Sequence, residues 1–391
     1  MLAPNISRDE ELHWLALKLV PGLGTRRIGA LVNRLRTPEA IFRASAAELR
    51  DAGAPPAVAR SIASGCTFDD AVVQHQSMID TGAALVSIRD PRYPAQLREI
   101  HDPPVVLFAR GRIELLGSIM LGVVGTRRPT PYGMAVAGRL SHDLAQAHLT
   151  IVSGMARGID TAAHRAALDA GGKTVAVFGC GVDRVYPAEN RGLAREIEKA
   201  GLLLSEFPMG TPAHPQNFPV RNRIVSGMGV GVLVVEGAQY SGSAITARLA
   251  MEQDRDVFAV PGNVTSKMSW GPNLLIKQGA KLVQEWTDIV EEFSPEHRRR
   301  LAGMAAPGDS DAGAEDSVTA GPRQTSLPLG PGEQAAREIL GCLKADQATH
   351  IDELLEKVEN CSSSEVLAAL FELEMRGSVR QLPGKNFVTV W

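Results

Sequence analysis

Short apolar runs, rich in valine, leucine and isoleucine, recur through the middle of this chain and constrain its fold more than any other feature. They are IMLGVVG from residue 119, LTIVSG from 149, KTVAVFG from 173, GLLLSE from 201, GVLVVE from 231 and DVFAVPG from 256. Because the runs are almost continuously apolar, the strands they predict are buried on both faces. Helix-compatible segments separate them, at residues 133–148, 160–170 and 243–253. The pattern predicts a largely parallel sheet covered by helices.

This alternation over residues 80–300 predicts an α/β core with an extended, Rossmann-like, doubly wound and mostly parallel sheet. In such a sheet, ligands bind in the crevice beyond the carboxyl ends of the strands. We therefore expect a functional site in the loops that follow the apolar runs.

The N-terminal segment, residues 1–75, predicts a small helical domain of the SAM or helix-hairpin-helix kind. Apolar residues at helical spacing lie on both sides of Pro21-Gly22-Leu23-Gly24, where glycines allow a sharp turn. Such a hairpin can hold a DNA phosphate on the N–H groups at a helix start. The alternative is a packing or docking module with an ordinary tight turn.

The C-terminal part of the chain divides into a linker and a last domain. Residues 303–332 are rich in Gly, Ala, Pro, Ser and Asp and predict a flexible linker. Residues 333–391 predict a winged helix, with helices near 334, at 351–357 and at 362–376, then strands near 379–382 and 387–390. Ser362 and Glu365 fit a capping box at the start of the third helix.

The charge of this winged helix bears on its partner. It holds ten Asp and Glu against six Lys and Arg, a net of −4, and its presumed recognition helix carries Glu365, Glu372 and Glu374. A helix that reads duplex DNA is normally basic, because phosphate neutralisation dominates affinity. We interpret the unit as a protein-contact or regulatory module rather than a duplex reader.

Bulk properties narrow the class of protein. The 391 residues carry a net charge of −3, so any basic surface must be local. The four cysteines, Cys66, Cys180, Cys342 and Cys361, include no CxxC pair, which argues against a disulfide framework or a zinc site. The acidic N-terminus is not a signal peptide, and no stretch reaches the ~18 apolar residues of a membrane span. These features predict a cytoplasmic protein.

The first candidate site segment is VVGTRRPTPYG, which starts at residue 123 and follows a predicted strand. Gly125 allows close backbone approach, Thr126 offers a hydroxyl, and Arg127 and Arg128 offer planar forks that suit phosphate. The spacing is not that of a dinucleotide-binding glycine fingerprint. The alternative is an exposed loop with solvated arginines.

The second segment, SGMARGIDTAAHRAAL from residue 153, also lies between a predicted strand and a helix. Ser153, Gly154 and Arg157 could form an anion cradle together with backbone N–H groups. Asp160 could instead cap the helix. We interpret His164, alone on that helix, as structural rather than catalytic.

The third segment, SEFPMGTPAHPQNFPVRNRIVSGM from residue 205, is proline-rich and predicts a long loop before a helix. We expect Arg221, Asn222 and Arg223 to open that helix, where its dipole adds to the positive charge. Phe218, just ahead of them, could stack on a base. The alternative places Phe218 in the core and pairs one arginine with a carboxylate.

Two further loops contribute candidates. Ser241, Gly242 and Ser243 precede a helix, where small hydroxyl residues bind oxyanions or simply cap the helix. Asp183 and Tyr186, in GCGVDRVYPAEN from residue 179, are available to a base or a sugar, with an ordinary loop role equally open.

The sequence carries none of the common catalytic motifs considered next. The chain has no GxxxxGK[ST], HExxH or GxSxG motif and no convincing pair of nucleophile and base. We therefore predict a binding protein with no catalytic residue, metal site or cofactor.

Taken in order, these segments resemble the DNA-processing protein DprA family, also called Smf. The shared motifs are YPAQLREIHDPPVVLFARG (93–111), VVGTRRPTPYG, SGMARGIDTAAH, GCGVDRVYP, FPVRNRIVSG, SGSAITA, VFAVPGN and GPNLLIKQGA. The resemblance covers nearly the whole central domain. It implies a protein that binds single-stranded DNA, protects incoming strands and loads RecA onto them, displacing single-strand-binding protein, in natural transformation and recombination. It also implies a homodimer through the central domain.

The resemblance further implies roles for individual residues. Arg127, Arg157, Arg221 and Arg223 would hold phosphates, Gly125, Ser153, Gly154 and Ser243 would lend hydrogen bonds, and Phe218 and Asn222 would lie beside a nucleotide. The full predicted set of DNA contacts is Gly125, Thr126, Arg127, Arg128, Ser153, Gly154, Arg157, Phe218, Arg221, Asn222, Arg223, Ser241, Gly242 and Ser243.

Two other functions stay open at this point. A nucleotide-cleaving enzyme resembling the LOG phosphoribohydrolases would share the Gly-rich anion loop, but it would carry a PGGxGTxxE motif. The corresponding segment here, VEGAQYSGSAITA from residue 235, lacks that glutamate pattern. A small-nucleotide sensor is the third hypothesis.

Overall fold

The computed structural model describes residues 7–239 and 241–305, and in the C-terminal part 339, 342–343, 349–358, 366, 369–370, 373, 379–382 and 386–389. The chain separates into two compact units, residues 1–309 and 310–391. The predicted linker beyond residue 305, the helix near residue 334 and the Ser362 cap lie outside the described residues.

The N-terminal segment is helical, as predicted, although it continues to residue 81 rather than 75. Its helices are α1 (Arg8–Leu19), α2 (Thr25–Leu35), α3 (Pro38–Arg43), α4 (Ala46–Asp51), α5 (Pro56–Ala63) and α6 (Phe68–Thr81). Hydroxyl side chains cap several of them, and Ser45 and Glu48 form a capping box at α4. The loop 21–24 joins α1 to α2.

The central sheet confirms the doubly wound, mostly parallel fold. Its strands are β1 (Ala84–Ser87), β2 (Val106–Gly111), β3 (Met120–Val124), β4 (Thr150–Ser153), β5 (Lys173–Phe178), β6 (Leu202–Ser205), β7 (Gly231–Val234), β8 (Asp256–Ala259) and β9 (Lys281–Leu282). Their order is β1-β2-β6-β5-β4-β3-β7-β8-β9. The chain runs outward from β3 to β6, returns to β7 on the other side of β3, and continues to β9. The switch point at β3 is where such sheets bind ligands.

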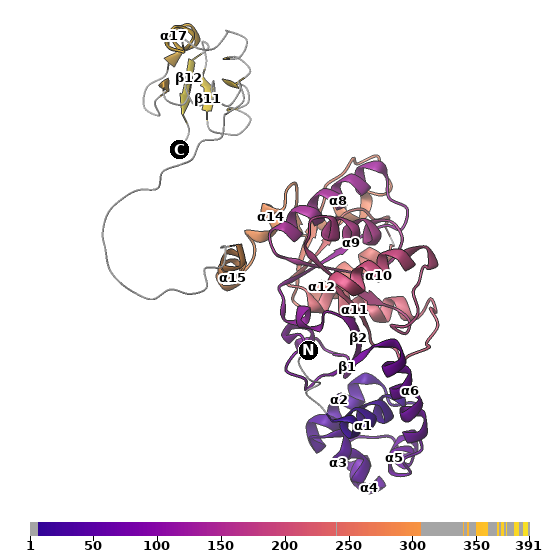
Figure 1. The fold of residues 1–391 in the computed structure, drawn as a ribbon. Helices are drawn as coiled ribbons and strands as arrows, with labels where there is room; N and C mark the ends of the chain where they lie inside the picture. The colour runs from indigo at the N-terminus through magenta and orange to yellow at the C-terminus, as the bar shows by residue number, and fades with distance from the viewer. Residues whose placement is uncertain are drawn as a thin grey trace, which may run out of the picture. The chain divides into compact units, whose positions relative to one another are not determined.

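Helices cover both faces of the sheet (Figure 1). They are α7 (Ala95–Glu99), α8 (Pro131–Gln146), α9 (Ile159–Asp169), α10 (Arg191–Ala200), α11 (Asn217–Met228), α12 (Gly242–Glu252), α13 (Trp270–Lys277), α14 (Thr287–Val290) and α15 (Pro295–Ala305), with 3₁₀ turns at Ile113–Gly117 and Ala188–Asn190. Strand β3 illustrates the two cores: Met120 and Val124 pack in the layer of α11 and α12, whereas Leu121 and Val123 pack in the layer of α8 and α9.

The edge formed by β1 and β2 was not among the predicted strands. Both are antiparallel to their neighbours, β1 to β2 and β2 to β6. The helical bundle lies beside this edge (Figure 1), and Trp14 of α1 and Phe108 of β2, both fully buried, belong to one apolar cluster. The bundle and the sheet therefore share a core.

The C-terminal unit confirms a winged-helix domain. It contains β10 (Thr349–His350), α17 (Ile351–Lys357), β11 (Val379–Leu382) and β12 (Asn386–Thr389), with the strands in the order β10-β12-β11. Leu354, Leu370 and Phe387 are among its buried apolar residues.

Two further properties concern only the part of the chain that the structure describes. No helix there is long and apolar enough to cross a membrane. No cluster of three or more His, Cys, Asp or Glu there is placed to hold a metal ion.

His164 of α9 is a buried, hydrogen-bonded residue of the core. Its ring is fully buried, and its Nδ1 lies 2.6 Å from the hydroxyl of Thr174. Because Thr174 donates its own proton to the carbonyl of Ile151, it accepts from Nδ1–H, and Nε2 has no partner among the described residues. Burial lowers the pKa of His164 to about 3.

This burial predicts a pH dependence of stability. The unfolded chain binds a proton on His164 near pH 6.5, whereas the folded protein rejects it until about pH 3. Above pH 6.5 the ring is neutral in both states, and its burial carries no protonation penalty. Below pH 6.5, protonation of the unfolded chain lowers the free energy of unfolding by about 1.4 kcal/mol per pH unit. Urea unfolding of His164→Gln should show a slope against pH, between pH 6 and pH 4, that is shallower by that amount. His214→Gln, at an exposed position, should keep the wild-type slope. An unaltered slope in His164→Gln would contradict the account.

Candidate functional site

A pocket of about 720 Å³ opens beyond the carboxyl ends of β3 and β4, at the switch point of the sheet. Its walls are the loop after β3, the loop after β4 and the first residues of α11 and α12. Eleven of the fourteen predicted contact residues line it: Gly125, Thr126, Arg127, Arg128, Gly154, Phe218, Arg221, Asn222, Ser241, Gly242 and Ser243.

The loop after β3 is held in shape by Glu236, a buried residue at the end of β7. The backbone N–H of Thr126 donates to the Glu236 carbonyl at 2.7 Å, and the N–H and hydroxyl of Thr130 donate to its carboxylate. Gly133 leaves room for this carboxylate, which a Cβ would overlap. Arg127 and Arg128 therefore stand exposed on a fixed loop. Sequence reasoning did not identify Glu236, because nothing in VEG distinguishes it from an ordinary strand end.

The loop after β4 corrects the predicted anion cradle. The Asp160 carboxylate accepts hydrogen bonds from the backbone N–H groups of Gly154 and Ala156, at 3.1 and 3.2 Å. These amides already have an anion, so they are not free to bind phosphate. Ser153 is fully buried and donates to the carbonyl of Val123, which places its hydroxyl outside the pocket.

Arg221 lies beneath this loop. Its side chain is buried, and Nη1 donates to the carbonyl of Val177 at 2.7 Å. Burial lowers the pKa of Arg221, an effect that the nearby Asp160 carboxylate opposes. Burial likewise raises the pKa of Asp160, and Arg221 opposes that shift. The guanidinium lies at the pocket wall, and its Nε atom is buried without a hydrogen-bond partner among the described residues.

The start of α11 differs from the prediction. The helix begins at Asn217, so Phe218 is inside its first turn, and Arg221 and Arg223 lie beyond it. Pro219 is tolerated because the first turn needs no N–H partner. The helix dipole therefore does not act on the two arginines as expected, since its effect fades within the first turn.

Aromatic side chains form one wall of the pocket. The rings of Tyr186 and Phe218 lie 5.6 Å apart between centroids, tilted by 35°. The Arg127 guanidinium carbon lies 5.4 Å from the centroid of Phe218, within cation–π range. Tyr186 is 48% exposed, so a flat ligand can reach its ring.

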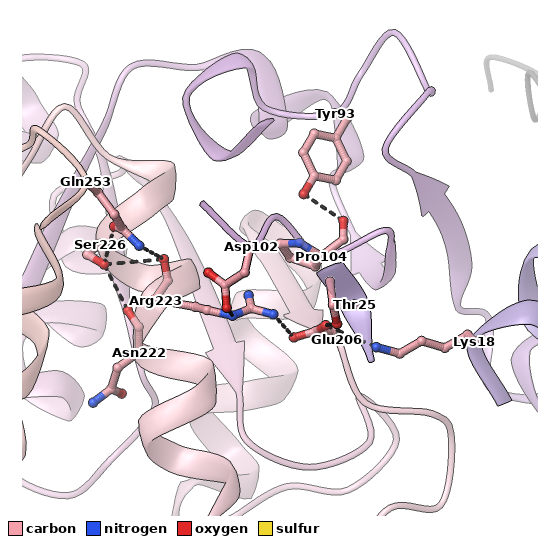
Figure 2. A network of polar contacts seen from close by, with 10 residues as sticks. All are labelled: Lys18, Thr25, Tyr93, Asp102, Pro104, Glu206, Asn222, Arg223, Ser226 and Gln253. Atoms are coloured by element: carbon pink, nitrogen blue, oxygen red, sulfur yellow. Dashed lines mark hydrogen bonds and ion pairs between the residues drawn. The ribbon is translucent and has the colours of Figure 1, made fainter. Parts of the chain in front are cut away.

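Two predicted arginines lie outside the pocket lining. Arg157 is exposed and makes two hydrogen bonds with the Glu189 carboxylate, at 2.7 and 2.9 Å. Arg223 is buried and ion-paired, its Nη2 to Glu206 at 2.6 Å and its Nε to Asp102 at 3.0 Å (Figure 2). Both charges are neutralised by neighbouring carboxylates. The alternative of an ion-paired arginine in the segment from residue 205 therefore applies to Arg223, and Arg157 is ion-paired as well.

The remaining lining comes from α11 and α12. Ser241 caps α12 by accepting from the N–H of Ala244, and its hydroxyl lies 2.8 Å from that of Ser243. Asn222 is half-buried, and its amide reaches the carbonyl of Gly242 at 3.5 Å. The Asn222 contact links α11 to the start of α12 beside the pocket.

The pocket lining also includes residues outside the predicted set of contacts. Asp160, Tyr186 and Thr246 stood in the candidate segments without being predicted as contacts, and Met268 and Ile245 carried no signal in the sequence. Among the described lining residues, Arg127, Arg128 and Arg221 stand against one carboxylate, that of Asp160, which makes the pocket cationic. A cationic pocket with an aromatic wall suits an anionic ligand that has flat rings.

The chain matches two family models. Residues 84–294 match the family described as DNA recombination-mediator protein A. Residues 322–385 match the family described as DprA winged helix domain.

Relatives extend these matches. Protein Smf of Escherichia coli is 39% identical over 293 residues, which are 75% of this chain and 74% of that protein. DNA processing protein DprA of Bacillus subtilis is 45% identical over 215 residues, 55% of this chain and 72% of that protein. The X-ray structure of DNA processing protein A from Streptococcus pneumoniae superposes with a TM-score of 0.64 at 37% identity, covering 74% of this chain and 99% of the other.

The close approach of Gly154 to Arg221 predicts a stability effect. A Cβ at position 154 would overlap Nη1 and Cζ of the buried guanidinium, so Gly154→Ala forces Arg221 out of place. We expect a loss of about 1–3 kcal/mol in the free energy of unfolding, measured by urea titration. Gly138→Ala in α8, where a Cβ meets nothing within 4 Å, should be neutral or stabilising. Equal stability of Gly154→Ala and wild type would show that the guanidinium is not fixed there.

Proposed function

Because the chain belongs to the DNA-processing protein DprA (Smf) family, we propose that it binds single-stranded DNA in the pocket beyond β3 and β4. In this proposal the protein is a recombination mediator of the cytoplasm. It protects incoming strands and loads RecA onto them, displacing single-strand-binding protein, in transformation and recombination.

The observation that carries this proposal is the grouping of Arg127 with the rings of Phe218 and Tyr186. Base stacking on aromatic side chains tolerates any sequence, because every base has a π-face. Bases in a duplex are already stacked on each other and have no free face to offer. A pocket that combines rings with arginines therefore favours a single strand over a duplex.

The phosphates of that strand would be held by the cations of the pocket. Arg127 and Arg128 are exposed on the fixed loop after β3, and the buried Arg221 lines the pocket and adds its positive charge. The hydroxyls of Thr126 and Ser241 and the amide of Asn222 add neutral hydrogen-bond partners. We no longer assign phosphate contacts to Arg157 and Arg223, because each is paired with a carboxylate.

The partners follow from the same proposal. A mediator that hands a strand to RecA must hold it firmly enough to exclude single-strand-binding protein and loosely enough to release it. A homodimer through the central domain would present two pockets to one strand, which raises the effective concentration of the second contact.

Salt dependence tests the phosphate contacts. Three arginine contacts to a single strand predict that log affinity falls against log salt with a slope of about −2. The measurement is fluorescence anisotropy of labelled oligothymidine between 50 and 300 mM salt, repeated with a duplex of equal length. Affinity that hardly changes with salt, or a preference for duplex, would contradict the proposal.

Substitution of Arg127 tests the pocket itself. Arg127→Ala should weaken binding to all single-stranded sequences alike and make the salt slope shallower by about 0.7, the share of one phosphate. Arg112→Ala is the matched control, because Arg112 is a half-buried arginine outside the pocket, paired with Glu114. RecA filament nucleation on coated strands, followed in the same variants, should fall with Arg127→Ala only. A separate incubation of the protein with AMP tests the alternative function, because release of free adenine would favour a nucleotide-cleaving enzyme.

A further inference from the structure

A second cationic hollow lies between the helical bundle and the edge of the sheet. It has a volume of about 810 Å³, and we call it the basic cleft. Its cationic side chains are Arg26 from α2, Arg89 from the loop after β1 and Arg98 from α7. No carboxylate belongs to its described lining, in a protein whose acidic residues outnumber its basic ones.

Three carboxylates adjoin the lining, Asp90 and Asp102 in the chain and Glu206 through its bond to Thr25, and each is paired with another cation. Asp90 binds Arg92 at 2.6 Å. Asp102 and Glu206 bind Arg223, and Glu206 also binds Lys18 at 3.0 Å (Figure 2). These carboxylates therefore do not neutralise the arginines of the cleft.

The cleft arginines themselves have no carboxylate partner in the described part of the chain. Arg98 packs over the ring of Tyr93 and donates to two backbone carbonyls. Arg89 makes only a long contact, 3.4 Å, with the carbonyl of Val32. Arg26 and Arg89 are both exposed. Three guanidinium groups from three separate elements therefore border one hollow with their charge available to an anion.

The walls of the cleft are fixed before any ligand arrives. The hydroxyl of Thr25, the first residue of α2, donates to Glu206 at 2.9 Å, directly beside the Arg223 contact (Figure 2). No side chain caps the start of α2 at Gly24, so its first N–H groups add positive potential. A rigid cationic groove suits a polyanion better than an isolated surface charge does.

The basic cleft and the pocket beyond β3 and β4 lie at the same end of the sheet, the end at which β1 and β3 to β6 have their carboxyl termini. Strand β1 is antiparallel to β2, and β2 is antiparallel to β6, so the end of β1 faces the same way as the ends of β3 to β6. From β4 to β1 there are four strand steps, or about 20 Å at the usual strand spacing. Helix α11 joins the two sites, with Arg221 at the pocket and Arg223 bound to the Glu206 that holds Thr25.

We propose that the basic cleft binds the phosphodiester backbone of the single strand where it leaves the pocket. The inference rests on the proposed function, and it assigns a role in DNA binding to the helical bundle. At a stacked spacing of about 3.4 Å per nucleotide, the distance corresponds to roughly six nucleotides. A strand shorter than that occupies the pocket alone, and a longer one engages both sites.

Oligonucleotide length separates the cleft from the pocket. The variant is Arg26→Ala/Arg89→Ala. The control is Arg43→Ala/Arg112→Ala, which removes the same charge from two arginines outside the cleft that are paired with Glu39 and Glu114. Each protein is titrated with oligothymidines of 4 and 20 nucleotides across a salt series. Unfolding midpoints in urea establish that both variants remain folded.

The cleft variant should bind the 4-mer as wild type does. It should bind the 20-mer roughly fivefold more weakly, as two exposed charge contacts would contribute, with a salt slope shallower by about 1.4. The control should match wild type at both lengths. Wild-type affinity of the cleft variant for the 20-mer, or an equal loss at both lengths, would overturn the proposal.

The same titration keeps the two proposals apart. Arg127→Ala reports on the pocket at both lengths. If Arg127→Ala binds normally while the cleft variant loses the 20-mer, the pocket assignment fails and the cleft stands. If Arg127→Ala loses both oligonucleotides while the cleft variant binds normally, the cleft fails and the pocket stands.

Discussion

The arrangement of the pocket depends on one buried charge, the guanidinium of Arg221. It is held by the carbonyl of Val177 and balanced by the Asp160 carboxylate. Asp160 in turn accepts the amides of Gly154 and Ala156 and so shapes the loop after β4. A buried charge without compensation costs several kcal/mol, which is why these groups need one another. The loop geometry and the positive floor of the pocket therefore have a single cause.

Helix α11 uses neighbouring arginines for different purposes. Arg221 faces the pocket, whereas Arg223 points to Glu206 and Asp102 and ties the sheet to the helical bundle through Lys18 and Thr25. Any displacement of this helix would act on the pocket and on the bundle together. In our proposals one DNA strand contacts both the pocket and the bundle, and α11 fixes the position of one relative to the other.

The sequence predicted the parallel core because buried strands and crossover helices leave a strong local pattern. It did not predict β1 and β2, whose pairing with β6 depends on contacts far apart in the chain. Where loops follow strands, the candidate residues, such as Arg127, line the pocket. The candidate site was predicted less well where the outcome depends on a distant carboxylate. No local sequence pattern indicates that Arg223 pairs with Glu206 or that Arg157 pairs with Glu189. Likewise, the Asp160 carboxylate accepts hydrogen bonds from amides that were expected to bind phosphate.

The central claim is that bases of a single strand lie against the rings of Phe218 and Tyr186. The most direct test is photocrosslinking of an oligonucleotide that carries 5-iodouracil, followed by mass spectrometry of the crosslinked peptides. The account predicts adducts on Phe218 or Tyr186 that are competed away by unlabelled single strands. Adducts confined to other parts of the chain, with none on the segments that contain these two rings, would contradict it.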